Sequence, residues 1–308
     1  SSGATSRPLC CPLLYAVFDI SRYCCVRHQG HWETETHAPP SISTKTTVQK
    51  RLTFASAVLL SSIWLLSSTA HADEASYSIS LNVGAAPRYQ GTDQYAVTVM
   101  PGFRADFGNG LFFDPTRGGA GYVKHFANGM FASAAMSYDL GRSDENRYGR
   151  PGSDYLQGMG DVKGALLGNI TVGSKIVRDI TVSATLELPL TNRDRGWSGR
   201  LDINAPVVSW GANKITVSPS VYFGSRKYMQ TYFGVTPQQA ANSGFAPYVA
   251  ESGIQATSVS VAWRHSVSRN WTVQSAIGAT RLLGDAAKSP VVQNKQSYFG
   301  GAGVIYTF

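Results

Sequence analysis

The sequence predicts an all-β fold: a transmembrane, antiparallel, up-and-down β-barrel of about twelve strands, with short periplasmic turns and long external loops. Three observations lead to this prediction. Apolar and polar residues alternate along several segments, aromatic residues lie near the predicted strand ends, and the chain finishes on an apolar strand with a terminal phenylalanine. Side chains of a strand alternate between its two faces, so such segments suit a wall between lipid and a hydrated lumen.

The clearest alternation is at 76–85, where Tyr77, Ile79 and Leu81 face away from serine and asparagine side chains. The same pattern predicts strands at 180–190, 215–223, 258–264, 271–280 and 298–308. Weaker alternation predicts others at 95–106, 111–114, 121–125, 130–140, 161–174 and 200–209. The polar faces carry mostly Ser, Thr, Asn, Gln and Gly, whereas a soluble sandwich would present more Lys and Glu to bulk water. These faces therefore indicate a narrow, hydrated lumen.

The connections between the predicted strands alternate in length. Short, turn-like segments occur at 107–110, 127–129, 175–178, 211–213 and 265–270. Longer, more polar segments occur at 87–94, 141–158, 191–199, 225–252 and 284–296. With both ends of the barrel on one side, the short turns are expected to be periplasmic and the longer loops external.

Aromatic residues lie near both kinds of connection. Those beside the short turns are Phe107, Phe112, Phe126, Phe131, Trp210, Trp263 and Trp271. Those beside or within the long loops are Tyr89, Tyr95, Tyr138, Tyr155, Trp197 and Tyr248. Two such girdles are expected where amphipathic rings sit at the two membrane–water boundaries, although ordinary strand ends also carry aromatic residues.

The last strand resembles the signal that the barrel-assembly machinery reads in outer-membrane proteins. Gly303, Tyr306 and Phe308 carry this resemblance, and the strand departs from the usual pattern at Gly301, where a polar residue is expected. The ending therefore predicts a location in the outer membrane of a Gram-negative bacterium.

The region before the barrel, which is expected at 73–308, contains a predicted export signal. Residues 50–72 combine Lys50-Arg51, a serine-interrupted apolar run and a small-x-small site, which predict a secretory signal peptide cleaved after Ala72. A membrane anchor is the alternative, but the run is short for a spanning helix. All four cysteines precede it, in pairs without metal-ligand or redox spacing. We interpret residues 1–49 as an over-extended start or a disordered segment.

Three stretches resemble the MltA-interacting protein (MipA/OmpV) family: 84–113, 232–248 and, most specifically, 280–292 with the sequence TRLLGDAAKSPVV. The resemblance covers 73–308. It implies a Gram-negative outer-membrane barrel whose family includes a scaffold joining a lytic transglycosylase to a murein synthase, and members discussed as porin-like proteins or adhesins. We therefore expect a non-enzymatic scaffold, with a narrow solute channel or an adhesin as alternatives.

Two of these stretches also have structural interpretations. In the third, Arg281, Gly284, Asp285 and Pro290 are predicted to form a loop anchor, in which Gly284-Asp285 turns the chain and Arg281 pairs with Asp285. In the second, Thr236-Pro237 predicts the start of a short helix that Gly244 ends. Such a helix would lie in the longest loop as a plug, constriction or lid.

No pattern indicates a catalytic, cofactor or metal site. His125 and His265 map to the periplasmic end and are interpreted as structural. Asp144, Glu145 and Asp154 are interleaved with arginines, which favours a solvated, salt-bridged loop over a cation site. The chain has a formal net charge of +8, but nucleic acid does not suit an exported protein. We expect membrane lipid as a partner and lipopolysaccharide phosphates as ligands for arginines of the long loops, namely Arg142, Arg147, Arg150, Arg193 and Arg195.

Overall fold

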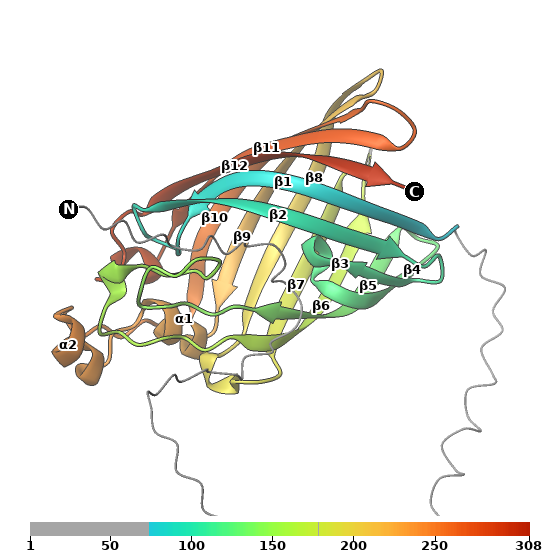
Figure 1. The fold of residues 1–308 in the computed structure, drawn as a ribbon. Helices are drawn as coiled ribbons and strands as arrows, with labels where there is room; N and C mark the ends of the chain where they lie inside the picture. Colours follow the sequence, from blue (N-terminus) through green and yellow to red (C-terminus); the bar gives the residue numbers. More distant parts are fainter. Residues whose placement is uncertain (1–73, 178) are drawn as a thin grey trace, which may run out of the picture. The chain divides into compact units, whose positions relative to one another are not determined.

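A computed structural model describes residues 74–177 and 179–308, so the segments predicted at 1–49 and 50–72 lie outside the described residues. The described chain contains twelve strands, each antiparallel to its neighbours in chain order, and β1 pairs with β12 to close the cylinder (Figure 1). This confirms the predicted fold class. The strands are β1 (Ser76–Pro87), β2 (Tyr95–Asp106), β3 (Leu111–Asp114), β4 (Gly119–His125), β5 (Met130–Asp139), β6 (Ala165–Lys175), β7 (Thr181–Pro189), β8 (Ser198–Trp210), β9 (Asn213–Gly224), β10 (Gly253–Ser266), β11 (Trp271–Leu282) and β12 (Gln296–Thr307).

The closing seam between β1 and β12 sets which face meets lipid. Ile79 pairs with Tyr306 and Val83 with Ala302, so the apolar sets of both strands share the outer face. Gly303 faces the lumen, where a Cβ atom would collide with the carboxamide of Asn82. The glycine therefore lets the two strands close beside a polar lumen-facing side chain.

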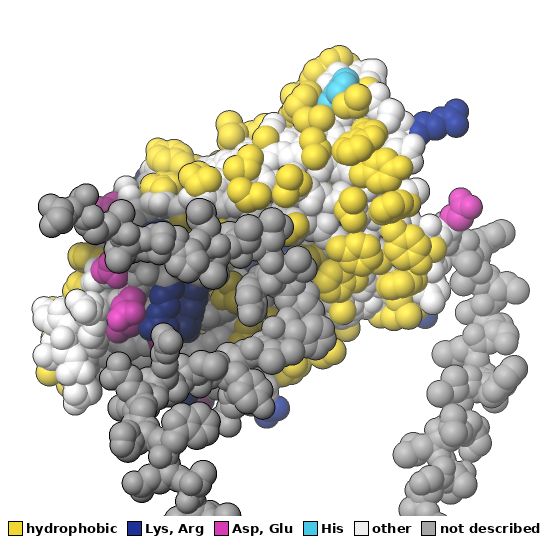
Figure 2. All heavy atoms as spheres, in the orientation of Figure 1, with side chains coloured by type: hydrophobic (Ala, Val, Ile, Leu, Met, Phe, Trp, Pro, Cys, Tyr) yellow, Lys and Arg dark blue, Asp and Glu magenta, His cyan; other side chains and the backbone are white. Residues whose placement is uncertain are grey.

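The outer wall is coated with exposed apolar side chains, which Figure 2 shows on the face that it displays. Leu81, Val97 and Ile277 are 54%, 72% and 67% exposed. A coat this extensive exceeds the apolar patches of soluble monomers, and it suits hydrocarbon. Because β1 pairs with β12, the sheet has no free edge at that seam, as a membrane requires.

Aromatic side chains border the coat at both ends, with four corrections to the prediction, since Phe131 packs against buried Phe112 and Tyr248 packs among the loops. Trp210 and Trp271 are exposed at the turn end, and Tyr138 is exposed at the loop end. Phe112, predicted for the girdle, is instead 3% exposed and faces inward, because the alternation of β3 turns its neighbours outward. Tyr89 is likewise buried, since the external loops cover it.

The lumen-facing residues bond to one another, either between neighbouring strands or, for Gln274 of β11 and Asn82 of β1, across Gly303 of β12. Thr171 and Thr185 hydroxyls lie 3.0 Å apart. Gln274 Nε2 donates to Asn82 Oδ1 at 2.9 Å, and Ser220 Oγ donates to Asp202 Oδ1 at 2.6 Å. This polar lining agrees with the hydrated lumen that the sequence predicts.

Short helical segments lie between the strands. The α-helices are α1 (Arg226–Phe233) and α2 (Pro237–Ser243), and the 3-10 turns are η1 (Pro115–Arg117), η2 (Asp154–Leu156), η3 (Arg193–Arg195) and η4 (Ala286–Lys288). In the part of the chain that the structure describes, no helix is long and apolar enough to cross a membrane. All but η1 belong to the long loops at one end of the barrel (Figure 1).

Candidate functional site

The long loops fold together into a plug, which we define as 88–94, 140–164, 225–252 and 283–295. Its first apolar core centres on Met229 and Phe233 of α1, each 1% exposed, which pack with Leu282 and Ala286. Ser289 Oγ donates to the Phe233 carbonyl at 2.5 Å and so joins the α1 loop to the β11–β12 loop.

A second apolar core joins the other loops to the same structure. Leu156, Val291 and Val235 are almost fully buried together with Tyr89, whose hydroxyl donates to the Val291 carbonyl at 2.9 Å. These residues come from four separate loops. The plug is therefore a packed structure, since each loop buries its apolar side chains against the others.

The sequence of the longest loop specifies its two helices. Ser225 caps α1 by accepting from the Tyr228 amide at 3.3 Å, and Met229 and Phe233 follow with helical spacing. Thr236 and Gln239 form a capping box at the start of α2, and Gly244, with a φ of 78°, ends it. The helix expected from Thr236-Pro237 is thus present, while α1 lacked a strong sequence pattern because it is only two turns long.

A buried polar cluster anchors α1 to the barrel wall. Arg195 Nη2 donates to Asp139 Oδ1 at 2.7 Å and also to the Tyr232 hydroxyl. Arg142 Nη1 donates to the Tyr232 carbonyl at 2.6 Å. Burial, followed by the nearby Asp139 carboxylate, raises the pKa of Tyr232 to about 12, so the phenol is neutral at physiological pH.

The cluster also corrects part of the prediction for lipopolysaccharide. Arg142 and Arg195 are 5% and 6% exposed and are held inside the plug, so their guanidinium groups are not available to lipopolysaccharide. Arg193 is exposed, with Nε donating to the Leu190 carbonyl at 3.2 Å. Arg147 is exposed and Arg150 is half-buried in the β5–β6 loop, and both pair with Asp161.

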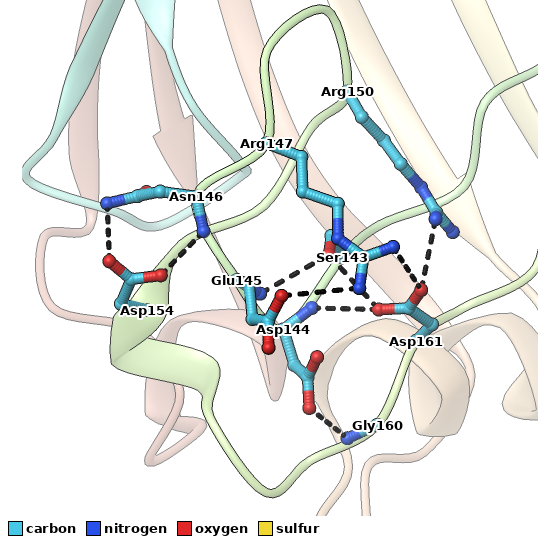
Figure 3. A network of polar contacts seen from close by, with 9 residues as sticks. All are labelled: Ser143, Asp144, Glu145, Asn146, Arg147, Arg150, Asp154, Gly160 and Asp161. Atoms are coloured by element: carbon cyan, nitrogen blue, oxygen red, sulfur yellow. Dashed lines mark hydrogen bonds and ion pairs between the residues drawn. The ribbon is translucent and has the colours of Figure 1, made fainter. Parts of the chain in front are cut away.

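Figure 3 shows how the β5–β6 loop uses its own charged groups. Asp154 accepts from the amide and the side chain of Asn146 at 2.6 and 2.8 Å, and Asp144 accepts from the Gly160 amide at 3.0 Å. Glu145 pairs with Arg147 at 3.3 Å. The β5–β6 loop is therefore salt-bridged, which is the interpretation that the sequence favoured over a cation site. Across the described residues, no group of three or more His, Cys, Asp or Glu is placed to hold a metal ion.

The residues predicted as a loop anchor lie at the β11–β12 connection, with one altered partner. Asp285 pairs with Lys288 at 3.5 Å and accepts from the Glu251 amide at 3.0 Å, instead of pairing with Arg281. Arg281 lies in β11 on the exposed face, because its parity there matches that of Ile277. Gly284 adopts a φ of 53°, as its predicted turn requires, and Pro290 directly precedes buried Val291.

At the turn end, the two histidines predicted to be structural and the residues of the predicted assembly signal contact aromatic side chains. The His265 ring stacks on Trp263, and its Nδ1 lies 2.9 Å from Asn213 Oδ1. His125 lies beside Phe131. Tyr306 of the predicted assembly signal packs against Trp271 and Phe308, and Phe308 is 69% exposed.

A closed apolar-coated cylinder with a polar lumen and with its long loops packed together at one end defines the class of protein: an outer-membrane β-barrel of a Gram-negative bacterium. The sequence matches the family described as MltA-interacting protein MipA over residues 79–308, so the chain belongs to that family. No curated protein matches the chain.

Several solved structures show a general likeness. The COG4313 outer membrane channel from Pseudomonas putida F1 has 8% identity and a TM-score of 0.39, covering 76% of this chain and 95% of that one. An anion-selective porin from Comamonas acidovorans has 10% identity and a TM-score of 0.32, covering 76% and 98%. Scores this low carry no functional information.

Proposed function

We propose that this protein is a non-enzymatic outer-membrane scaffold that holds a lytic transglycosylase, and through it a murein synthase, at its periplasmic end. The observation that carries the proposal is the plug. Two apolar cores and a buried arginine cluster fill the external mouth, and such packing does not suit a permanently open channel. The family description, which names an interaction with MltA, supplies the class of partner.

The turn end offers apolar contact points for a periplasmic partner. Ile176 and Val177 in the β6–β7 turn are 60% and 63% exposed, and Val267 in the β10–β11 turn is 60% exposed. These side chains lie beyond the strands, where apolar exposure to water is unfavourable unless a partner or headgroup region covers it. We assign the docking contact to these two turns.

Binding of a purified lytic transglycosylase to the immobilised barrel tests this assignment. Replacing Ile176, Val177 and Val267 by serine is expected to weaken binding about tenfold, as loss of central apolar contacts does at interfaces. Tyr148→Ser is the matched control, because Tyr148 is 97% exposed on an external loop. Unchanged affinity in the triple variant would remove the turns from the interface, and an absence of binding by the unaltered protein would reject the scaffold.

The polar lumen favours a second candidate function, a narrow solute channel gated by the plug. Planar-bilayer recordings separate the two. If the protein is only a scaffold, the unaltered protein should carry no current. If it is a gated channel, it should open briefly, and the openings should become continuous when 225–252 is replaced by a short Gly-Ser linker. Steady conductance by the unaltered protein contradicts the non-conducting scaffold.

A further inference from the structure

One part of the barrel wall lacks strand pairing. Every residue of β2 from Tyr95 to Asp106 pairs with β1, but on its other edge only Ala105 and Asp106 pair with β3. The reason is the length of β3, which has four residues where a membrane-spanning strand needs about ten. Across from β2, the end of β5 at Ser137–Asp139 has no partner on β4.

These unpaired edges border a part of the wall without strand pairing, which we call the lateral gap. Its lower border is the ion pair between Arg104 Nε and Asp114 Oδ2 at 2.7 Å. Its upper border is the loop contact in which Arg88 Nε donates to the Gly152 carbonyl at 3.0 Å. Met100, which faces the lumen, is 52% exposed within it. In Figure 1, β3 and β4 are short and lie at the turn end of the wall, whereas β2 runs along its length.

The edges of the lateral gap are polar, because they expose unpaired backbone groups. Unpaired backbone groups in hydrocarbon cost several kcal/mol each, so bare acyl chains cannot fill the gap. A strand added from another chain would satisfy those groups, but Pro101 lies in the middle of the open edge of β2. Proline is a device that blocks edge-to-edge pairing, because it lacks an amide hydrogen. Polar headgroups or water are therefore better occupants than a strand.

A polar cavity of about 200 Å³ is lined mostly by residues of β7 to β10 and by Tyr228 of α1. Gln90, from the loop that precedes β2, and Asp139, from the end of β5, complete the lining, so the cavity also touches one residue from each side of the gap. Its other walls include Glu187, Arg200, Tyr228 and Gln255. A site of this size takes a group of roughly six to eight heavy atoms, since a dry cavity of about 150 Å³ holds benzene.

The cavity is lined by two carboxylates, those of Asp139 and Glu187, and by one guanidinium, that of Arg200. Gln255 is 2% exposed, and its Oε1 has no hydrogen-bond partner among the described residues. Glu187 Oε1 lies 3.9 Å from Arg200 Nη1, which leaves it free for a closer donor. Burial, then Tyr232, Glu187 and Asp139, raise the pKa of Tyr228, which agrees with a negative potential there. A buried acceptor without a partner is costly, and a ligand that donates N–H groups would remove the cost.

We propose that the lateral gap admits the headgroup of a membrane amphiphile while its acyl chains stay in the bilayer, and that the cavity binds a primary ammonium of that headgroup. Ammonium supplies three donors and a positive charge to Gln255 Oε1, Glu187 Oε1 and Asp139 Oδ2, the carboxylate oxygen that does not bind Arg195. The proposal is independent of the scaffold, because the gap and the proposed docking turns are separate surfaces.

Fluorescence quenching in liposomes tests it. The protein is purified from outer membranes with Cys10, Cys11, Cys24 and Cys25 replaced by serine, and a fluorophore is attached at Met100→Cys. Ser260→Cys is the control, because Ser260 faces the lumen from β10, which β1, β12 and β11 separate from β2. The liposomes contain phosphatidylethanolamine or phosphatidylcholine spin-labelled near the acyl carbonyl, and the choline headgroup has no N–H donor.

Half-maximal quenching at Met100→Cys is expected at about tenfold less phosphatidylethanolamine than phosphatidylcholine, the factor that a hydrogen bond to a charged group supplies. Gln255→Leu and Glu187→Gln should each erase this preference, while Glu145→Gln on the external loop should keep it. Equal quenching by the two lipids overturns the ammonium site. Equal quenching at Met100→Cys and Ser260→Cys overturns entry through the gap. A heat-dependent gel shift identifies any variant that has not folded, and for such a variant Gln255→Met replaces Gln255→Leu.

Discussion

Arg195 on the β7–β8 loop donates to Asp139 at the end of β5 across 2.7 Å, and the same guanidinium reaches the hydroxyl of Tyr232 in α1. Three segments far apart in the chain therefore meet at one buried cation. The Arg195 side chain is 6% exposed and Asp139 is 37% exposed, so solvent screens the pair only partly.

Arg195→Met should loosen the plug without opening the cylinder. The change leaves Asp139 and the Tyr232 hydroxyl without their donor, at a cost of about 2 kcal/mol. We expect faster amide hydrogen exchange in 226–233 and unchanged exchange in β10 and β11. Arg193→Met on the same loop is the control, because Arg193 is exposed. Equal protection of α1 in both variants would contradict this role for Arg195.

Phe233→Ala should produce the largest single loss in the plug. Phe233 is 1% exposed at the centre of the first apolar core, and its truncation leaves a cavity that costs about 4 kcal/mol. The expected result is protease cleavage within 225–252, with the barrel still resistant and still shifted on unheated gels. Resistance of that loop in the variant would show that α1 does not hold it.

High pH should release the plug through its buried tyrosines. Tyr232 has a pKa of about 12 in the folded protein, against an ordinary value of about 10 in an unfolded chain. Because the folded-state pKa is raised, the contribution to stability is complete below pH about 10 and is lost as pH rises through about 12. Tyrosinate absorbance should increase together with exchange of α1, and Tyr232→Phe should remove that component. A titration unaffected by Tyr232→Phe would assign the transition to another group.

The terminal residue should matter for assembly more than for stability. Phe308 is 69% exposed and Tyr306 packs beside it, so Phe308→Ala should change unfolding by less than about 0.5 kcal/mol. If the assembly machinery reads this strand, the amount of barrel in the outer membrane should fall several-fold in cells. Normal membrane levels of Phe308→Ala would remove Phe308 from the assembly signal.

Lipopolysaccharide binding should depend on the exposed arginines alone. Arg193→Ala is expected to reduce lipopolysaccharide co-purification, because its guanidinium can reach phosphate. Arg142→Ala should leave co-purification unchanged and instead loosen α1, whose Tyr232 carbonyl it would no longer bind. Unaltered lipopolysaccharide content in both variants would reject the arginine contacts.

The period-two alternation of residues such as Tyr77, Ile79 and Leu81 determined the strands, their lipid-facing sides and the barrel class. That information is local, because a strand places successive side chains on opposite faces whatever its neighbours are. The start of α2 at Thr236 and the turn at Gly284 were also predicted from local sequence, because a helix cap and a turn each depend on a few consecutive residues.

Only the tertiary structure decided what the loops do and where the wall is incomplete. Arg142 and Arg195 read as free surface cations in the sequence, but loops distant in the chain bury them around Tyr232. The short length of β3 is visible in the sequence, yet the lateral gap between β2 and β5 depends on which strand edges then lack a pairing partner. Burial and strand pairing are relations between distant segments, and the periodicity of one segment does not encode them.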